Sequence, residues 1–276
     1  MSAPKTKTRA PLGRVRIMLG ILVLSLVGIG VMMHTLMGRT GAEAAQASPT
    51  PAPTATASPT PVPTPSPEPT PVLPDVDIDG WELQMIRYEY PLGEDFAPEE
   101  LTDVGDGQRM DSRVAPAIEE LIADAKEAGY GVYVCSGYRD YDTQYSIYWN
   151  HIYEYRQQGK SEEEAHELTR LAVNYPGCSE HQSGLCVDIL EYYGQDMEPY
   201  IGGSGLMLWL EKHCAEYGFV VRYPDGKTDI TGVEYEPWHL RYVGKTAAEY
   251  ITENGLCLEE FLGLYGVELR SEPPEE

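Results

Sequence analysis

A stretch of low sequence complexity divides this chain and limits what it can fold into. From Ser48 to Pro74 the sequence is almost only Pro, Thr, Ser and Ala. Such a segment cannot bury a core and favours extended polyproline II, which rises about 3.1 Å per residue. We therefore expect residues 39–74 to be a disordered linker. About 200 residues from Asp75 onward remain, which is enough for one well-buried domain.

The residues before the linker have the features of a membrane-targeting segment. Residues 1–16 are basic, and a largely apolar run follows at residues 17–38. Roughly 20 apolar residues span a bilayer, so we expect a transmembrane signal-anchor there. The basic tail would then lie in the cytoplasm, with the domain at 75–276 outside the cell membrane. A cleaved signal peptide is the alternative, because Ala42-Glu43-Ala44 has the small-x-small pattern of a cleavage site; the domain would then be secreted.

Charge and cysteine content limit the partners of this domain. The chain has 44 Asp and Glu against 20 Lys and Arg, a formal net charge of −24 at pH 7. A nucleic-acid partner is not expected, because few basic groups are available to neutralise phosphates. Five cysteines fall in the predicted extracellular domain, where disulfides can persist, and at least one is unpaired in the monomer that we expect. Cys178 and Cys186 are one candidate pair, although sequence does not determine the pairing.

The pattern of apolar residues predicts an α+β fold. Helical spacing with capping signals predicts helices at 112–128, from Asp140 or Asp142, from Ser161, at 204–217 and over most of 245–264. Short alternating runs predict strands at 132–134, 219–222 and 238–243, with an initial strand and loop within 82–96. Strands and helices do not alternate regularly. We therefore expect a small, mainly antiparallel sheet flanked by helices.

Two segments carry the residues of a candidate metal site. His181 and Asp188 are seven residues apart and would face opposite sides of one continuous strand, but Gly184 can supply a turn between them. Glu236 and His239 would diverge on a strand, and converge if Pro237 opens a single helical turn. Two imidazoles and one carboxylate are typical of a catalytic zinc site, whose fourth position holds water. Glu236 is then available as a general base.

Other side chains are candidates for contacts with a substrate. Arg139 follows a predicted strand and can bind a carboxylate or polarise a carbonyl, although a structural salt bridge is an equal alternative. Gln144 and Ser179 can supply neutral hydrogen bonds, and Tyr138 and Trp238 can wall the site. The remaining histidines, at 34, 151, 166 and 213, lack a partner at ligand spacing and are not expected to bind metal.

At these residues the chain resembles the VanY-type D-alanyl-D-alanine carboxypeptidases, zinc peptidases of the bacterial cell wall. The motifs that carry the resemblance are Ser136-Gly137-Tyr138-Arg139 with Gln144, Ser179-x-His181-x-x-Gly184-x-x-x-Asp188, and Arg222-Tyr223-Pro224 with Tyr235-Glu236-Pro237-Trp238-His239-x-Arg241-Tyr242. The resemblance covers roughly Trp81 to Leu262 and implies the α+β fold of the hedgehog amino-terminal domain. It implies that one zinc ion is held by His181, Asp188 and His239. It further implies a catalytic base at Glu236 and substrate contacts at Arg139, Gln144 and Ser179.

The function that the resemblance implies is removal of the terminal D-alanine from peptidoglycan stem peptides. An L,D-carboxypeptidase or an endopeptidase acting on the same peptides would use the same zinc chemistry, so both alternatives stay open. A non-catalytic wall-binding module with a structural zinc is a more distant alternative, since all the expected ligands and Glu236 are present. A serine nucleophile is not expected, because the one Ser-x-x-Lys motif lies in the basic tail at residues 2–5.

Overall fold

The computed structural model describes residues 72–270 of the chain. The predicted cytoplasmic tail, the predicted transmembrane segment and nearly all of the predicted linker lie outside the described residues. Within residues 72–270, no helix combines the length and the apolar character needed to cross a membrane. The described part of the chain therefore corresponds to the predicted domain.

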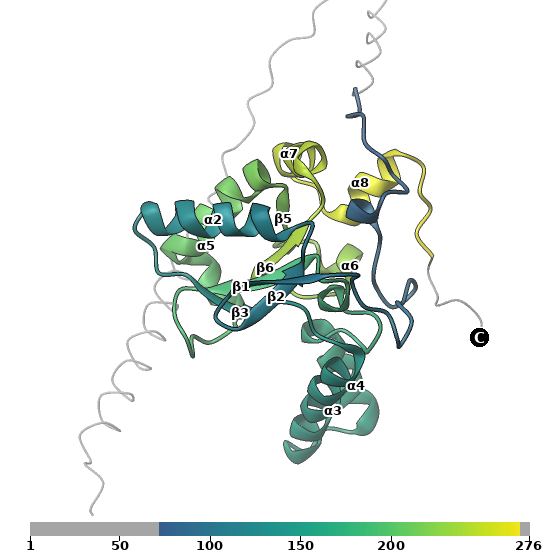
Figure 1. The fold of residues 1–276 in the computed structure, drawn as a ribbon. Coiled ribbons are helices and arrows are strands. Elements are labelled where there is room, and N and C mark those ends of the chain that lie inside the picture. Colours follow the sequence, from purple (N-terminus) through teal and green to yellow (C-terminus); the bar gives the residue numbers. More distant parts are fainter. Residues whose placement is uncertain (1–71, 271–276) are drawn as a thin grey trace, which may run out of the picture. The chain divides into compact units, whose positions relative to one another are not determined.

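A four-stranded sheet forms the centre of this domain (Figure 1). Its strands, in spatial order, are β3 (Tyr133–Ser136), β4 (Cys186–Leu190), β6 (Glu236–Tyr242) and β5 (Phe219–Tyr223). Every adjacent pair is antiparallel, so the predicted α+β fold with a small antiparallel sheet is confirmed. The two central strands, β4 and β6, are buried along almost their whole length. Polar side chains on them are therefore held in fixed positions inside the protein.

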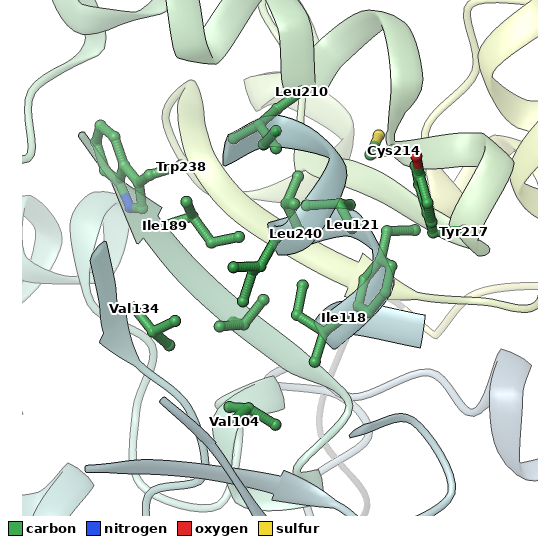
Figure 2. Packing of buried hydrophobic residues seen from close by; sticks show 14 of the residues in the cluster. Val104, Ile118, Leu121, Val134, Ile189, Leu210, Cys214, Tyr217, Trp238 and Leu240 are labelled. Carbon is green, nitrogen blue, oxygen red and sulfur yellow. The ribbon is translucent and has the colours of Figure 1, made fainter. Parts of the chain in front are cut away.

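Helices flank the sheet. Their bounds are α2 (Ala115–Glu127), α3 (Tyr141–Gln157), α4 (Glu162–Ala172), α5 (Gly205–His213), α6 (Thr228–Thr231), α7 (Lys245–Glu253) and α8 (Leu258–Leu264). Apolar side chains of α2 and α5 join those of the central strands in one buried cluster, which includes Leu121, Ile189, Leu210 and Leu240 (Figure 2). The helices α3 and α4 pack on each other and project together from the sheet (Figure 1).

Local capping signals predicted the starts of α3 and α4 correctly, whereas α2, predicted from residue 112, begins at Ala115 after Val114, which has no side-chain cap. Asp140 caps α3 by accepting a hydrogen bond from the backbone N–H of Thr143 at 2.8 Å. Ser161 and Glu164 form the predicted capping box of α4. The helix predicted at 204–217 is instead divided, because α5 ends at His213 and a 3₁₀ turn completes the segment.

The sequence prediction was wrong in two segments near the start of the domain. Residues 82–96 form no strand, and contain only one isolated antiparallel bridge, between Arg87 and Tyr90. Pro91 follows at once and has no backbone N–H with which to continue a ladder. An unpredicted hairpin comes next, formed by β1 (Leu101–Gly105) and β2 (Gln108–Asp111). Its turn contains an Asp-Gly pair, and both residues have positive φ, as a tight hairpin turn requires.

Candidate metal centre and active site

A short turn followed by a strand brings His181 and Asp188 together. His181 lies in the 3₁₀ helix Glu180–Ser183, and Asp188 lies in β4. Gly184 ends the 3₁₀ helix with φ of 70°, as expected for a residue that must reverse the chain. The predicted role of Gly184 is therefore confirmed. One consequence is that both side chains reach the same side of the sheet.

Replacing Gly184 with alanine should destabilise the fold. A Cβ there would lie 2.9 Å from the backbone nitrogen of Asp111, in addition to the strain of a positive φ. Gly194 is a matched control, since it has φ of 79° but no atom within 4 Å of the position that a Cβ would occupy. We expect Gly184→Ala to lower the melting temperature clearly more than Gly194→Ala, measured by thermal unfolding. Equal shifts would mean that the close backbone approach is unimportant.

Glu236 and His239 converge by a mechanism that differs from the prediction. The helical turn expected at Pro237 is absent, because both residues lie in the strand β6. The pairing of β5 with β6 is shifted there, with Val221 opposite Leu240 but Tyr223 opposite Glu236. This irregularity places extra residues on β6 relative to β5, as a β-bulge does. As a result, Oε2 of Glu236 lies 3.7 Å from Nδ1 of His239.

The three predicted ligands meet at one point. Nε2 of His181 lies 3.3 Å from Oδ2 of Asp188, and Nδ1 of His239 lies 3.0 Å from Oδ1 of the same carboxylate. The two imidazole rings are 4.9 Å apart between centroids and nearly perpendicular. Asp188 Oδ1 is buried and has no hydrogen-bond partner in the described part of the chain. A buried, unpaired carboxylate oxygen between two imidazoles fits a bound cation.

The orientation of His181 is fixed by the backbone. Its Nδ1 lies 2.7 Å from the carbonyl oxygen of Gly137. A carbonyl can only accept, so Nδ1 carries the proton and the lone pair of Nε2 points toward Asp188. Such a backbone contact typically selects the tautomer of a metal-binding histidine.

Cys186 is a further candidate ligand that sequence reasoning did not identify as one. Its sulfur and one nitrogen each of His181 and His239 lie within 4.8 Å of one another. Burial alone would raise the pKa of this thiol, but the two histidines lower it to about 7. Cys186 is nevertheless fully buried and stands opposite Arg241 in the sheet, whereas Asp188 stands opposite His239 and lines the cavity. Access from the cavity therefore favours Asp188 as the third ligand.

None of the five cysteines forms a disulfide in the described structure. The candidate pair Cys178 and Cys186 is thus not bridged, and both side chains are buried. The sulfur of Cys186 is directed to the histidines, as described above.

The carboxyl group of Glu236 is buried beside the candidate ligands. Burial raises its pKa to about 8, and the nearby charge of Asp188 adds to the effect, while His239 opposes it. Its Oε2 lies 3.7 Å from Nδ1 of His239, so the location of this carboxyl group is appropriate for a general base.

A cavity of about 400 Å³ opens in front of these residues. Arg139, Ser179 and Trp238, three of the predicted substrate-contacting residues, line it. Arg139 forms no ion pair within residues 72–270, and its buried Nε has no hydrogen-bond partner there. The alternative of a structural salt bridge is therefore not what the structure shows.

The other two predicted contact residues lie outside the cavity lining. Tyr138 is partly buried, and its backbone N–H donates to the carbonyl of Arg109 at 2.6 Å. Gln144 is buried and donates from Nε2 to the carbonyl of Asn174 at 2.6 Å. Because Asn174 does line the cavity, Gln144 supports the cavity wall from behind.

Sequence reasoning did not select several aromatic side chains of the cavity, among them Tyr223 and His151. Tyr223 lies with its ring centroid 5.0 Å from that of His239, and its hydroxyl accepts from Asn174 at 3.1 Å. His151 also lines the cavity, from α3. Tyr223 lies within the Arg222-Tyr223-Pro224 motif, so the sequence contained a pattern from which its place in the site could have been predicted. His151 had no such signal, because it depends on the packing of α3.

Comparison with known proteins adds independent information. The family model described as VanY, D-alanyl-D-alanine carboxypeptidase, matches residues 107–245, a segment that contains every candidate ligand. A D-alanyl-D-alanine carboxypeptidase of Enterococcus faecalis is 37% identical over 186 residues, which cover 67% of this chain and 67% of the relative. The chain belongs to the VanY family. The resemblance seen in the sequence motifs is thus confirmed.

Solved structures of VanY-family relatives have the same fold. A vancomycin-resistance D,D-pentapeptidase VanY in complex with Zn(II) is 37% identical and superposes with a TM-score of 0.60, over 66% of this chain and 99% of that one. The LD-carboxypeptidase LdcB is also 37% identical, with a TM-score of 0.56 over 65% of this chain and 84% of that one. This chain is therefore similar both to a structure named for D,D activity and to one named for L,D activity.

Proposed function

We propose that this chain is a zinc-dependent carboxypeptidase that removes the terminal D-alanine from peptidoglycan stem peptides. The observation that carries the proposal is the convergence of His181, Asp188 and His239 beside the buried carboxylate of Glu236, in a cavity open to a substrate. The Enterococcus faecalis relative is named for this activity, and the related D,D-pentapeptidase binds Zn(II). Both names support the proposal.

One zinc ion per chain would be held by Nε2 of His181, the carboxylate of Asp188 and Nδ1 of His239. These donor types are the ones that catalytic zinc sites use, with three protein ligands. When bound, zinc polarises the scissile carbonyl and activates the attacking water. The remaining steps fall to side chains of this chain.

Glu236 acts as the general base and then as the general acid of the reaction. Its carboxylate lies next to the ligands, with Oε2 at 3.7 Å from Nδ1 of His239. From there it accepts a proton from the attacking water and passes it to the leaving amine of the terminal D-alanine. The bulged part of β6 keeps it on the cavity side of the ligands.

Arg139 and Ser179 position the peptide. The guanidinium of Arg139 has a buried Nε without a partner among the described residues, so it can donate to a substrate carboxylate or to the oxygen of the scissile carbonyl. Ser179 precedes the 3₁₀ helix that carries His181 and can add a neutral hydrogen bond. Trp238 and Tyr223 provide apolar walls.

Replacing Arg139 with alanine should lower kcat/KM by about 100-fold or more, because a charged donor to the substrate is lost in a partly desolvated site. Zinc content should not change, since Arg139 holds none of the ligands. Arg156→Ala is the matched control, because Arg156 is exposed at the far end of α3 and does not line the cavity. Steady-state kinetics and metal analysis give the answer; wild-type kcat/KM in Arg139→Ala would contradict the assignment.

A second candidate activity, that of an L,D-carboxypeptidase, is favoured by the likeness to LdcB. The two activities differ in the bond that is cut, while the proposed ligands and base serve both. The full-length protein should be offered a muramyl pentapeptide ending in D-Ala-D-Ala and, separately, the tetrapeptide, with released D-alanine followed by mass spectrometry. Release from the pentapeptide supports the D,D assignment, and release from the tetrapeptide alone would transfer it to the L,D class. Release from neither would favour an endopeptidase or a wall-binding module.

The location of the enzyme is also a proposal. We propose that the apolar segment at 17–38 anchors the chain in the cell membrane, that the linker holds the domain away from it, and that the protein acts as a monomer. Cell fractionation tests the anchor, since the full-length chain should sediment with membranes and resist extraction by salt. A shortened chain in the medium that begins after Ala44 would instead show a cleaved signal.

A further inference from the structure

A group of four charged side chains is fully buried beneath the candidate zinc site. Glu180, Arg222, Arg241 and Glu259 each have at most 2% of their surface exposed. Arg222 binds both carboxylates, donating from Nε to Glu180 at 2.7 Å and from Nη1 and Nη2 to Glu259 at 2.8 and 2.7 Å. Charges buried at this depth need complete pairing, so their arrangement is not interchangeable. We call these four residues the buried charge cluster.

The two oxygens of Glu180 have very different surroundings. Oε1 accepts from Nε of Arg222 at 2.7 Å and from Nη1 of Arg241 at 2.8 Å. Oε2 is equally buried but has no hydrogen-bond partner in the described residues. A buried carboxylate oxygen without a partner is costly and indicates that a donor belongs there.

The nearest candidate donor is the free nitrogen of His239. Its Nε2 lies 3.5 Å from Oε2 of Glu180 and is likewise buried without a hydrogen-bond partner in residues 72–270. The other ring nitrogen, Nδ1, faces Asp188 at 3.0 Å. If Nδ1 donates its lone pair to a metal, Nε2 must carry the proton. A protonated Nε2 of His239 could therefore donate to Oε2 of Glu180, and each of these two atoms would gain the partner that it lacks.

We propose that Glu180 is a positioning residue for His239, accepting a hydrogen bond from Nε2 so that the lone pair of Nδ1 is directed at the zinc site. The inference rests on the proposed zinc site and adds to it a function for the buried charge cluster. A carboxylate on the outer nitrogen also makes the imidazole a better ligand. Glu180 touches neither substrate nor reacting atoms, and acts through His239.

The fold explains how Glu180 reaches this place. Glu180 and His181 are neighbours in the same 3₁₀ helix, so one side chain enters the cluster while the next reaches the zinc site. Arg241 follows His239 by two residues on β6 and thus lies on the same face of the strand. Three backbone carbonyls, of Glu82, Gln84 and Tyr242, also hold the Arg241 guanidinium. Arg222 and Arg241, which hold the carboxylate of Glu180, are thus held in place by their own hydrogen bonds.

The two histidine ligands would then be oriented by different means. His181 faces a backbone carbonyl, that of Gly137, through its Nδ1. His239 would face a charged carboxylate through its Nε2. A mutation can remove the second partner without touching the first, which makes the inference testable.

The test compares Glu180→Gln with Glu259→Gln in the purified full-length protein. Both changes remove one carboxylate charge from the buried charge cluster, but Glu259 binds arginines only and does not face His239. Zinc affinity is measured by competition with a chromophoric chelator. We expect Glu180→Gln to weaken zinc binding by about 10- to 100-fold, the usual effect of losing such an outer partner, with Glu259→Gln close to wild type. Equal losses in both variants would overturn the inference, because they would reflect only damage to the cluster.

A spectroscopic readout separates positioning from stability. With saturating cobalt in place of zinc, the visible spectrum reports the geometry of the ligands. The spectrum should change in Glu180→Gln and stay as in wild type in Glu259→Gln. An unchanged spectrum and an unchanged zinc affinity in Glu180→Gln would overturn the inference and leave the proposed function intact. Failure of the wild-type protein to bind zinc would overturn the proposed function itself.

A measurement without any mutation covers the case in which Glu180→Gln does not fold. Long-range ¹H–¹⁵N NMR of the zinc-loaded wild-type protein identifies the protonated nitrogen of each histidine. We expect His239 to be protonated at Nε2, with a proton that exchanges slowly with solvent because it is held by Glu180. Protonation at Nδ1, or rapid exchange at Nε2, would overturn the inference.

Discussion

Replacing Glu236 with alanine is expected to lower kcat by about 100- to 10,000-fold, the range that a positioned general acid–base supplies. Zinc should remain bound, because the ligands come from other residues. Removing a carboxylate that lies 3.7 Å from Nδ1 of His239 should change the affinity for zinc little. Steady-state kinetics with released D-alanine and metal analysis of the same sample check both parts.

Glu234→Ala is the matched control for this experiment. Glu234 lines the same cavity two residues earlier, but its side chain is exposed. It should therefore keep most of the activity. Turnover by Glu236→Ala near the wild-type rate would contradict the mechanism, and loss of zinc from that variant would mean that Glu236 is a ligand.

The second large effect is expected at the third ligand. Replacing Asp188 with alanine removes the carboxylate that contacts both imidazoles. Only His181 and His239 then remain of the three proposed ligands. Loss of a ligand should weaken zinc binding by more than the roughly 100-fold that an outer partner contributes. Saturating zinc should therefore raise the melting temperature of wild type but not of Asp188→Ala. At 100 times Kd the wild-type gain corresponds to about 2.7 kcal/mol of stability.

Cys186→Ala serves as the counterpart, because Cys186 is the other group near both histidines. Its side chain is fully buried and does not line the cavity, so the variant should bind zinc and turn over substrate like wild type. The reverse result, with zinc lost in Cys186→Ala and kept in Asp188→Ala, would show that the sulfur is the ligand.

The parts of the fold that were predictable from sequence depend on local chemistry. The starts of α3 and α4 follow from Asp140 and Ser161, whose side chains cap the backbone within three residues. The turn at Gly184 follows from a residue that tolerates positive φ. The site ligands could be selected for the same reason, since their types and spacing are visible in two short segments.

The parts that could not be predicted depend on pairing between distant segments. The bulge that brings Glu236 to His239 exists only in the register between β5 and β6, so a helical turn was the available alternative in the sequence. Glu180 was overlooked because its partners, Arg222 and Arg241, are more than 40 residues away. A glutamate between two site residues has no visible function until those arginines are placed.

The proposed zinc site is tested most directly with a crystal of the zinc-loaded protein, examined by anomalous diffraction at the zinc absorption edge. We expect one zinc ion per chain, about 2.0–2.2 Å from Nε2 of His181, a carboxylate oxygen of Asp188 and Nδ1 of His239, with Glu236 outside this set. A zinc ion bound to the sulfur of Cys186 and to Nε2 of His239, or no zinc between these histidines, would contradict this expectation.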